Sequence, residues 1–272
     1  MSLLTVDRSR CVQCGLCVFV CPRGLIQIEN GWPSLPTPQL CIACGHCVAV
    51  CPSSALDHEC APLAGQLPLP DCCRPDSEST LFFLRSRRSI RCFDSKPVSR
   101  DLLRRLLEAA RFAPSGGNSQ GISYRVIDSL PHLRQLTANT IAWMEEPAQA
   151  LSVKSPVYAQ YVAMYRQGGC DSILRDAPAL ILGTAAKTFA RGRENTLLAL
   201  EYAELYASTL GLGTCWAGLL EDAAFAGYPP LLETLRLPDE KQLTAALMVG
   251  FSKINFQRLV DRQPLDITFV EA

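Results

Sequence analysis

The sequence predicts an α+β protein in which a small N-terminal domain precedes a larger one. The N-terminal part contains the same cysteine pattern twice, whereas from Leu81 onward helical and strand patterns alternate without a regular βαβ repeat. A proline-rich stretch with little periodicity separates the two parts. We therefore expect domains at residues 1–58 and 81–272, joined by a linker over 59–80.

Both copies of the cysteine pattern have the spacing C-x2-C-x2-C-x3-C and end in proline, and they are offset by thirty residues. The eight cysteines are Cys11, Cys14, Cys17, Cys21, Cys41, Cys44, Cys47 and Cys51. This spacing is that of bacterial ferredoxins with two cubane clusters, so residues 1–58 resemble a 2×4Fe–4S ferredoxin domain.

The resemblance implies that the ligand sets cross, because the fourth cysteine of each run binds the other run's cluster. One cluster is then expected at Cys11, Cys14, Cys17 and Cys51, and the second at Cys41, Cys44, Cys47 and Cys21. A segment this short buries little apolar core, so we expect loss of iron to unfold it. Two zinc sites would explain neither the crossover nor the Cys-Pro endings. A disulfide framework is disfavoured because no secretory signal accompanies it.

The charge balance argues against some classes of partner. The chain has 26 Lys and Arg against 26 Asp and Glu, which gives no global field for nucleic acid. The most apolar run, 178–186, is too short to span a bilayer and predicts a buried strand. We expect a cytoplasmic redox protein that binds neither nucleic acid nor membrane.

Three cysteines lie in the predicted linker, namely Cys60, Cys72 and Cys73. Their spacing fits no four-ligand metal site, and His58 is the only imidazole nearby. We interpret them as ordinary surface or half-buried thiols.

Hydrophobic periodicity predicts the main elements. Ser99 should cap a helix from about Arg100 to Phe112, and residues 194–210 should form a helix that ends at a glycine-rich segment. Helical pieces rich in aromatic residues are expected over 139–170. Strands are expected at 25–28, before a turn at Asn30-Gly31, and at 122–128, 179–182, 244–250 and 266–270.

Four segments of the larger part resemble, in order, the motifs of the nitroreductase family of FMN enzymes. The first three are Arg-Arg-Ser-Ile-Arg-Cys-Phe at 87–93, Pro-Ser-Gly-Gly-Asn-Ser-Gln at 114–120 and Gly-Leu-Gly-Thr-Cys-Trp-Ala-Gly at 211–218. The fourth is Val-Gly-Phe at 249–251 with the basic residues that follow. Together they extend over nearly all of residues 81–272.

The resemblance implies a role for each matching residue. Arginine forks and hydroxyl donors suit a phosphate dianion, so Arg87, Ser89 and Arg91 should contact the phosphate or the pyrimidine edge of FMN. The remaining residues that the resemblance assigns to the flavin are Arg88, Pro114, Ser115, Asn118, Gln120, Gly218, Lys253, Arg258 and Arg262. Of these, Asn118 would bond the ring, Arg258 with Lys253 or Arg262 would close the phosphate site, and Gly218 would give backbone access near the reactive nitrogen.

Simpler interpretations exist for several of these residues. An arginine cluster is often a solvated surface, and Gly211 and Gly213 could serve only to end a helix. Cys215 invites interpretation as a nucleophile, but we expect a structural role. Trp143 and three nearby tyrosines could be core or a substrate lid, and the sequence leaves both open.

The sequence therefore predicts a homodimeric, FMN-dependent oxidoreductase with two fused 4Fe–4S clusters. The clusters would pass electrons to FMN, which would reduce a nitro, quinone or activated alkene compound without an obligatory acid–base side chain. A ferredoxin or another donor would supply the electrons. The alternatives are an electron-transfer module for another redox protein, a redox sensor, and an enzyme with reversed electron flow. No Rossmann glycine-rich turn is present, so no dedicated dinucleotide fold is expected.

Overall fold

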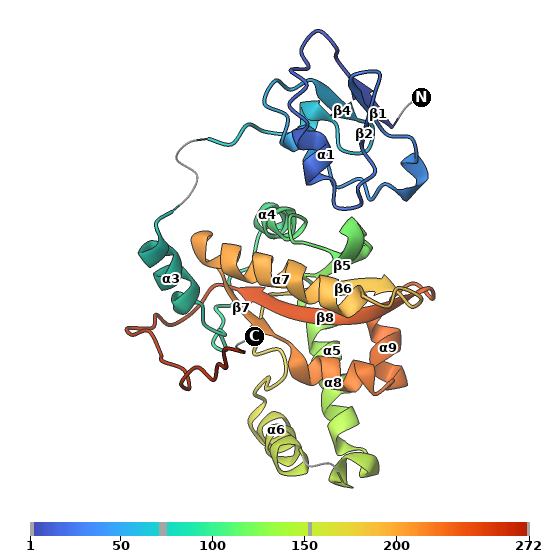
Figure 1. Ribbon diagram of the computed structural model, residues 1–272. Helices are drawn as coiled ribbons and strands as arrows, with labels where there is room; N and C mark the ends of the chain where they lie inside the picture. The colour runs from blue at the N-terminus through green and yellow to red at the C-terminus, as the bar shows by residue number, and fades with distance from the viewer. Residues whose placement is uncertain (1–2, 71–74, 152–153, 271–272) are drawn as a thin grey trace. The chain divides into compact units, whose positions relative to one another are not determined.

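The computed structural model describes residues 3–70, 75–151 and 154–270 (Figure 1). The chain divides into two compact units. The first comprises Met1–Pro75 with Gly116–Ser119, and the second comprises Asp76–Ser115 with Gln120–Ala272.

The first unit is built from two similar halves. Strand β1 (Leu4–Val6) pairs antiparallel with β4 (Leu56–His58), and β2 (Gln27–Glu29) pairs with β3 (Trp32–Ser34). The short helices α1 (Leu16–Val20) and α2 (His46–Ala49) follow the cysteine turns of the two halves, and 3-10 turns lie at Pro38–Leu40, Leu63–Gly65 and Gly116–Asn118. The core is small, with Leu4, Cys17, Ile26, Val48 and Leu56 at its centre.

The predicted hairpin is present in the first unit. Asn30 and Gly31 have φ values of 50° and 82°, the left-handed conformation that a tight hairpin turn requires. The strand before the turn begins at Gln27, two residues later than predicted. The glycines at the starts of α1 and α2, Gly15 and Gly45, have φ values of 74° and 72°, so the sequence repeat is also a conformational repeat.

The second unit is organised around one antiparallel sheet with the strand order β5-β6-β8-β7. Its strands are β5 (Ile122–Ile127), β6 (Ala179–Ala186), β7 (Gly213–Trp216) and β8 (Lys241–Gly250). Strand β6 is buried along nearly all its length, as the apolar run predicted. An antiparallel sheet with helices from separate parts of the chain confirms the α+β class.

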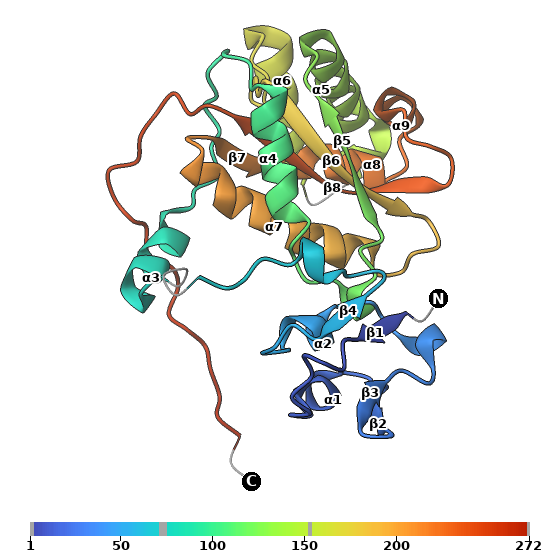
Figure 2. The ribbon, with the colours of Figure 1, turned by 90° about the horizontal axis from the view of Figure 1, so that it is seen from above.

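Helices cover both faces of this sheet (Figures 1 and 2). The helices of this unit are α3 (Ser77–Ser86), α4 (Arg100–Ala110), α5 (Leu130–Glu145), α6 (Ser155–Gly168), α7 (Gly192–Thr209), α8 (Gly218–Phe225) and α9 (Pro229–Leu235), with a 3-10 turn at Pro147–Leu151. Alternate residues of β6 enter different cores, because successive side chains in a strand point to opposite faces. Leu180 and Leu182 pack with α5, α8 and α9, whereas Ala179 and Ile181 pack with α4 and α7.

Several sequence predictions of single elements are confirmed. The Ser99 hydroxyl caps α4 by accepting the N–H of Leu102 at 3.3 Å, and Leu103 and Leu106 are buried on the inner side of that helix. Helix α7 extends the predicted helix at 194–210 by two residues at its start and ends at Thr209, just before Gly211. Helix α3 begins inside the range predicted as linker, because the Asp76 side chain caps it.

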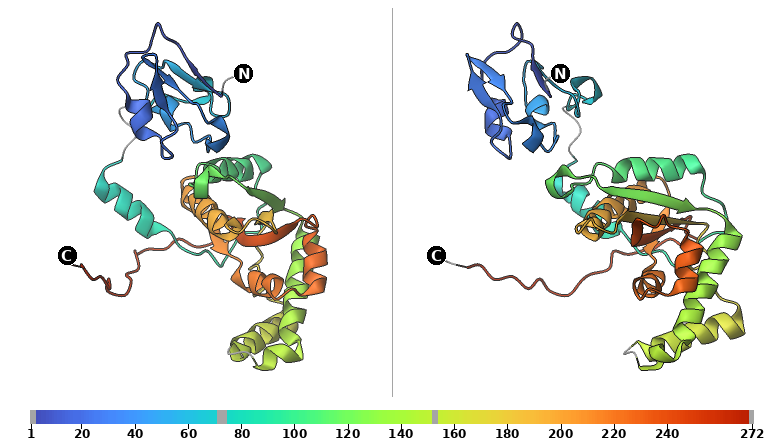
Figure 3. Two further views of the ribbon diagram at one scale, coloured as in Figure 1. Left: turned by 45° about the vertical axis from the view of Figure 1, so that its right-hand side comes forward. Right: turned by 90° about the vertical axis from the view of Figure 1, so that its right-hand side faces the viewer.

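The predicted strand at 266–270 is wrong. These residues form neither helix nor strand, and the segment after β8 runs as an extended tail (Figure 3). The alternation of Leu265, Ile267 and Phe269 suggested a strand, but their side chains are 57–83% exposed, and no ladder among the described residues receives them. A strand needs a neighbouring edge to pair with, which periodicity cannot reveal.

Candidate functional site

The eight cysteines of the repeated motifs line two cavities in sets of four. One cavity is lined by Cys11, Cys14, Cys17 and Cys51, and the other by Cys21, Cys41, Cys44 and Cys47. The cysteines are thus grouped as the ferredoxin resemblance led us to expect, with the last cysteine of each run beside the first three of the other. No disulfide links any of these eight cysteines. Among the described residues, no three His, Cys, Asp or Glu side chains converge as they would around a single metal ion.

Backbone donors point at the crossing cysteine of each run. The N–H of Leu25 lies 3.3 Å from Cys21 Sγ, and the N–H of Ala55 lies 3.2 Å from Cys51 Sγ. Burial alone would raise the pKa of each thiol, but the backbone donors outweigh it and lower both pKa values. The two donors are again thirty residues apart, so both halves prepare the crossing sulfur as a thiolate ligand in the same way.

The third cysteine of each run, Cys17 or Cys47, is shielded from solvent more than the crossing cysteine. Burial raises the pKa of Cys47 to about 11, and it raises the pKa of Cys17 as well. Such thiols ionise readily only beside a cation that compensates the buried charge. Four sulfurs around each mainly apolar cavity thus fit an iron–sulfur cluster, which supplies that positive charge.

In the second unit, the arginine-rich segment lies against β7. Ser89 forms a parallel bridge with Thr214, and the N–H of Ile90 donates to the carbonyl of Thr214 at 2.8 Å. The same segment meets the chain after β8, where Phe93 bridges to Ser252. Three of the four motifs are therefore adjacent in space.

A buried carboxylate holds two of these motifs together. Glu204 of α7 is 2% exposed, and its Oε1 accepts from Arg87 Nη1 at 3.0 Å and from the Thr214 hydroxyl at 3.1 Å. Its Oε2 accepts from the indole Nε1 of Trp216 at 2.9 Å. Burial, followed by the charge of Glu204, raises the pKa of neighbouring Glu201. Sequence reasoning missed Glu204, because a helical glutamate carries no signal until its three partners are placed.

The other residues of the first motif face different surroundings. Arg91 is exposed, whereas Arg88 is half-buried. Arg88 Nε is buried with no hydrogen-bond partner among the described residues, and its guanidinium lies 5.3 Å from the ring centroid of Phe256. A buried donor of this kind favours an acceptor from a ligand, and phosphate oxygens are suitable acceptors.

The basic residues after β8 divide into two groups. Lys253 is brought to the first motif, since its N–H donates to the carbonyl of Cys92 at 2.9 Å while its side chain is exposed. Arg258 and Arg262 lie further along the extended tail, where both are exposed. Within the described chain, no hydrogen bond or ion pair ties either of them to the Arg87–Arg91 segment.

The second motif is divided between the two units. Pro114, Ser115 and Gln120 help to line a cavity of about 100 Å³ in the second unit, and the Ser115 hydroxyl accepts the N–H of Gln120 at 3.1 Å. Asn118 is grouped with the first unit, where its amide donates to the carbonyls of Ile42 and Ala43 at 3.0 Å each.

The last residue of the third motif, Gly218, has open space beside its Cα. Gly218 begins α8, is exposed, and would place a Cβ within 4 Å of no other atom. Its conformation therefore needs no glycine, so a functional requirement for one would come from a ligand. Cys215 is 5% exposed, and burial raises the pKa of its thiol despite the opposing charge of Arg91. This environment fits the structural role that we expected for Cys215.

The aromatic segment contributes mainly to the core. Trp143 and Tyr158 are buried with their ring centroids 5.4 Å apart, and Tyr161 and Tyr165 pack against the same core.

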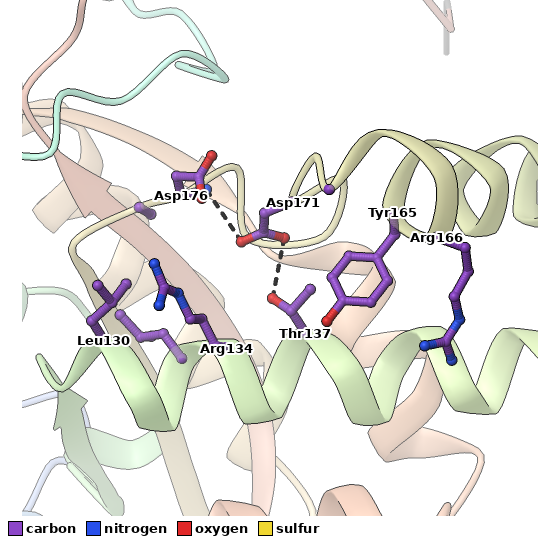
Figure 4. A pocket seen from close by; sticks show the side chains of 10 residues that line it. Leu130, Arg134, Thr137, Tyr165, Arg166, Asp171 and Asp176 are labelled. Atoms are coloured by element: carbon purple, nitrogen blue, oxygen red, sulfur yellow. Dashed lines mark hydrogen bonds between the residues drawn. The ribbon is translucent and has the colours of Figure 1, made fainter.

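A further cavity of about 500 Å³ lies between α5, α6 and the loop before β6 (Figure 4). Asp171 organises this loop by accepting from the Thr137 hydroxyl and from backbone N–H groups, including that of Asp176. Burial, with a contribution from Asp171, raises the pKa of Asp176. Figure 4 shows Tyr165 reaching from α6 toward α5. None of the residues predicted to bind flavin lines this cavity.

The fold, the crossed cysteines and the adjacent basic motifs define an oxidoreductase with a dicluster domain. Residues 84–251 match the family model described as "Nitroreductase family", and residues 3–56 match that of the "4Fe-4S dicluster domain". The first match spans more than half of the chain, so the chain belongs to the Nitroreductase family.

Individual relatives agree with this assignment. A protein of Archaeoglobus fulgidus named "Putative NADH dehydrogenase/NAD(P)H nitroreductase" is 27% identical over 185 residues, which cover 65% of this chain and 87% of that protein. A crystal structure of a nitroreductase with bound FMN from Bacteroides fragilis has a TM-score of 0.56 at 20% identity, covering 72% of this chain and 100% of that one. Another from Desulfitobacterium hafniense, also with FMN, has a TM-score of 0.57 at 22% identity and covers 71% and 98%. At these identities the two structures show the shared fold.

In the part of the chain that the structure describes, no helix combines the length and the apolar character that crossing a bilayer requires.

Proposed function

We propose that this protein is an FMN-dependent oxidoreductase that receives electrons through two 4Fe–4S clusters and reduces a small electrophilic acceptor. The observation that carries the proposal is the combination in one chain of two crossed cysteine sets and a Nitroreductase-family unit. Clusters transfer electrons one at a time, whereas organic acceptors of this kind take up pairs. Bound FMN would supply the conversion between the two.

The first motif and the adjoining residues would hold the phosphate. Arg88 presents a buried Nε without a partner among the described residues, and Arg91 and Lys253 have exposed side chains on the two segments that meet there. Arg87 would act partly through its ion pair with Glu204, the carboxylate that also accepts from the Thr214 hydroxyl. These contacts support a cationic cradle built from both ends of the unit.

The flavin ring would lie near the start of α8. The space around Gly218 is open, and the first N–H groups of a helix lack partners within that helix. Such donors suit the polar edge of a flavin. Pro114, Ser115, Asn118 and Gln120 would complete the site, contributed by a second copy of the chain, and Arg258 and Arg262 would close the phosphate end.

A homodimer would also bury the apolar side chains that the second unit leaves exposed. Leu81, Phe82 and Leu84 of α3 are 48–57% exposed, and the tail carries Leu265 and Phe269 at more than 80% exposure. Light scattering coupled to size-exclusion chromatography would give the mass of a dimer of 29.8 kDa chains.

The first test is the cofactor content of protein purified without oxygen. The proposal expects one FMN and eight irons per chain, measured by flavin fluorescence after denaturation and by iron and sulfide analysis. Protein with full iron but no affinity for FMN would overturn it. A flavin that no nitro, quinone or alkene acceptor reoxidises would instead favour an electron-transfer module or a redox sensor.

A further inference from the structure

The two halves of the first unit offer nearly the same surroundings to their clusters. Gln13 and Ala43 have φ values of 56° and 51°, and the donors to the crossing cysteines, Leu25 and Ala55, are also related by the thirty-residue offset. Two clusters in identical surroundings would have similar reduction potentials, because potential depends on charge, hydrogen bonds to sulfur and exposure.

The clearest break in this similarity lies at one pair of equivalent positions. Ile28 lines the cavity of Cys11, Cys14, Cys17 and Cys51, whereas His58, thirty residues later, lines the other cavity. His58 is 2% exposed, and its Nε2 lies 3.5 Å from Cys41 Sγ. An isoleucine side chain has no donor to offer at the corresponding place.

The hydrogen bonds of His58 assign its tautomer. Nδ1 accepts the N–H of Cys60 at 3.1 Å, so in a neutral imidazole the proton resides on Nε2. Nε2–H then donates to Cys41 Sγ. A hydrogen bond to a ligand sulfur stabilises the reduced cluster, which carries more negative charge, and therefore raises its potential.

A contact at the other cluster reduces the difference that His58 creates. The Ser53 hydroxyl lies 3.7 Å from Cys51 Sγ. This contact is longer than that of His58, and Ser53 is half-buried whereas His58 is buried, so solvent screens the Ser53 contact more strongly. The donor of His58 is therefore expected to dominate the difference between the clusters.

We propose that His58 makes the two clusters inequivalent, so that the cluster bound by Cys41, Cys44, Cys47 and Cys21 has the higher potential. Each reduction takes up one electron and makes or breaks no bond. Because the reduction potential of this cluster is higher, a single electron in the first unit would reside mainly there. The proposal depends on the cluster cysteines and not on the flavin chemistry. His58 does not bind iron itself; its hydrogen bond to the sulfur of Cys41 stabilises the reduced cluster.

The test is an anaerobic redox titration of the full chain, followed by electron paramagnetic resonance. The clusters of the wild-type protein should show two one-electron midpoints, separate from the titration of any bound flavin. His58→Met, which removes the donor and keeps similar bulk, should lower the upper midpoint and leave the other in place. We expect the reduced-to-oxidised ratio of that cluster at a fixed potential to fall by about tenfold, the equivalent of one charge-assisted hydrogen bond, or about 59 mV.

Two further variants keep the test decisive. His58→Gln retains an N–H donor and should restore most of the lost potential. Ile28→His, at a site that is 52% exposed, should raise the lower midpoint and bring the two together. If His58→Met loses iron, the test rests on Ile28→His: a rise in the lower midpoint supports the proposal, and an unchanged lower midpoint overturns it. Midpoints that stay unchanged in both Ile28→His and His58→Met, or a fall that His58→Gln does not reverse, would overturn the proposal.

Discussion

The carboxylate of Glu204 should contribute more to stability than any exposed ion pair of the second unit. Glu204→Gln keeps the side-chain volume but removes the charge. The two carboxylate oxygens accept from three groups, with Arg87 and Thr214 at Oε1 and Trp216 at Oε2. An amide has one oxygen, so in either orientation its NH2 group faces a donor.

The structure sets the size of this effect. Hydrogen bonds to charged groups contribute about 1.5–3 kcal/mol, and an unpaired buried donor costs about 1–3 kcal/mol. The Arg87 side chain is 23% exposed, so water compensates part of the loss. We expect Glu204→Gln to lower the free energy of unfolding by about 2–4 kcal/mol, below the loss from breaking a fully buried pair.

Urea unfolding followed by tryptophan fluorescence measures this loss, because Trp143 and Trp216 both lie in the second unit. The matched control is Glu108→Gln, which breaks the ion pair of Glu108 with Arg111, whose side chains are 57% and 60% exposed. That control should change stability by less than about 1 kcal/mol. Equal losses in the two variants, at unchanged urea dependence, would refute the reasoning about Glu204.

Three further predictions concern the clusters, a buried phenol and the flavin site. If the ligand sets cross, the double variant Cys14→Ser/Cys51→Ser damages one cluster and keeps about half of the iron. The double variant Cys14→Ser/Cys21→Ser then damages both clusters. The reverse iron contents would mean that the sets do not cross. Burial raises the pKa of Tyr124 to about 12. The unfolded chain loses this proton near pH 10, so stability should fall as pH rises from about 10 to 12, and Tyr124→Phe should flatten that fall in urea unfolding. Gly218→Ala should leave the melting temperature nearly unchanged, since its Cβ meets no atom within 4 Å, yet weaken FMN binding at least about tenfold by fluorescence titration; unchanged affinity would place the flavin elsewhere.

Local sequence patterns were sufficient to predict several structural features of the first unit. The Asn30-Gly31 turn follows from residues that tolerate left-handed backbone, and the two cysteine runs are recognisable by their spacing, whereas the crossing of their sets was implied by the ferredoxin resemblance. In the second unit, the apolar run of β6 and the Ser99 cap were also local signals. The turn, the buried strand and the cap depend on neighbours in the chain, so periodicity and residue type were sufficient to predict them.

Features that depend on distant partners were not predictable. Glu204 gains its role from Arg87, Thr214 and Trp216, which only the folded sheet brings to α7. The sequence marks His58 only as the imidazole nearest to the linker cysteines, because its burial beside Cys41 follows from the pairing of β4 with β1. The false strand at 266–270 has the same origin, since alternation cannot supply a pairing edge.

The central claim is that electrons reach FMN through the clusters, and flavin bleaching by reduced ferredoxin in an anaerobic stopped-flow experiment tests it most directly. Wild-type protein should bleach rapidly, with the iron–sulfur absorbance changing first. Cys14→Ser with Cys21→Ser, reconstituted to the same flavin content, should bleach far more slowly. Equal bleaching rates in the two proteins would show that electrons enter the flavin directly and would contradict the account.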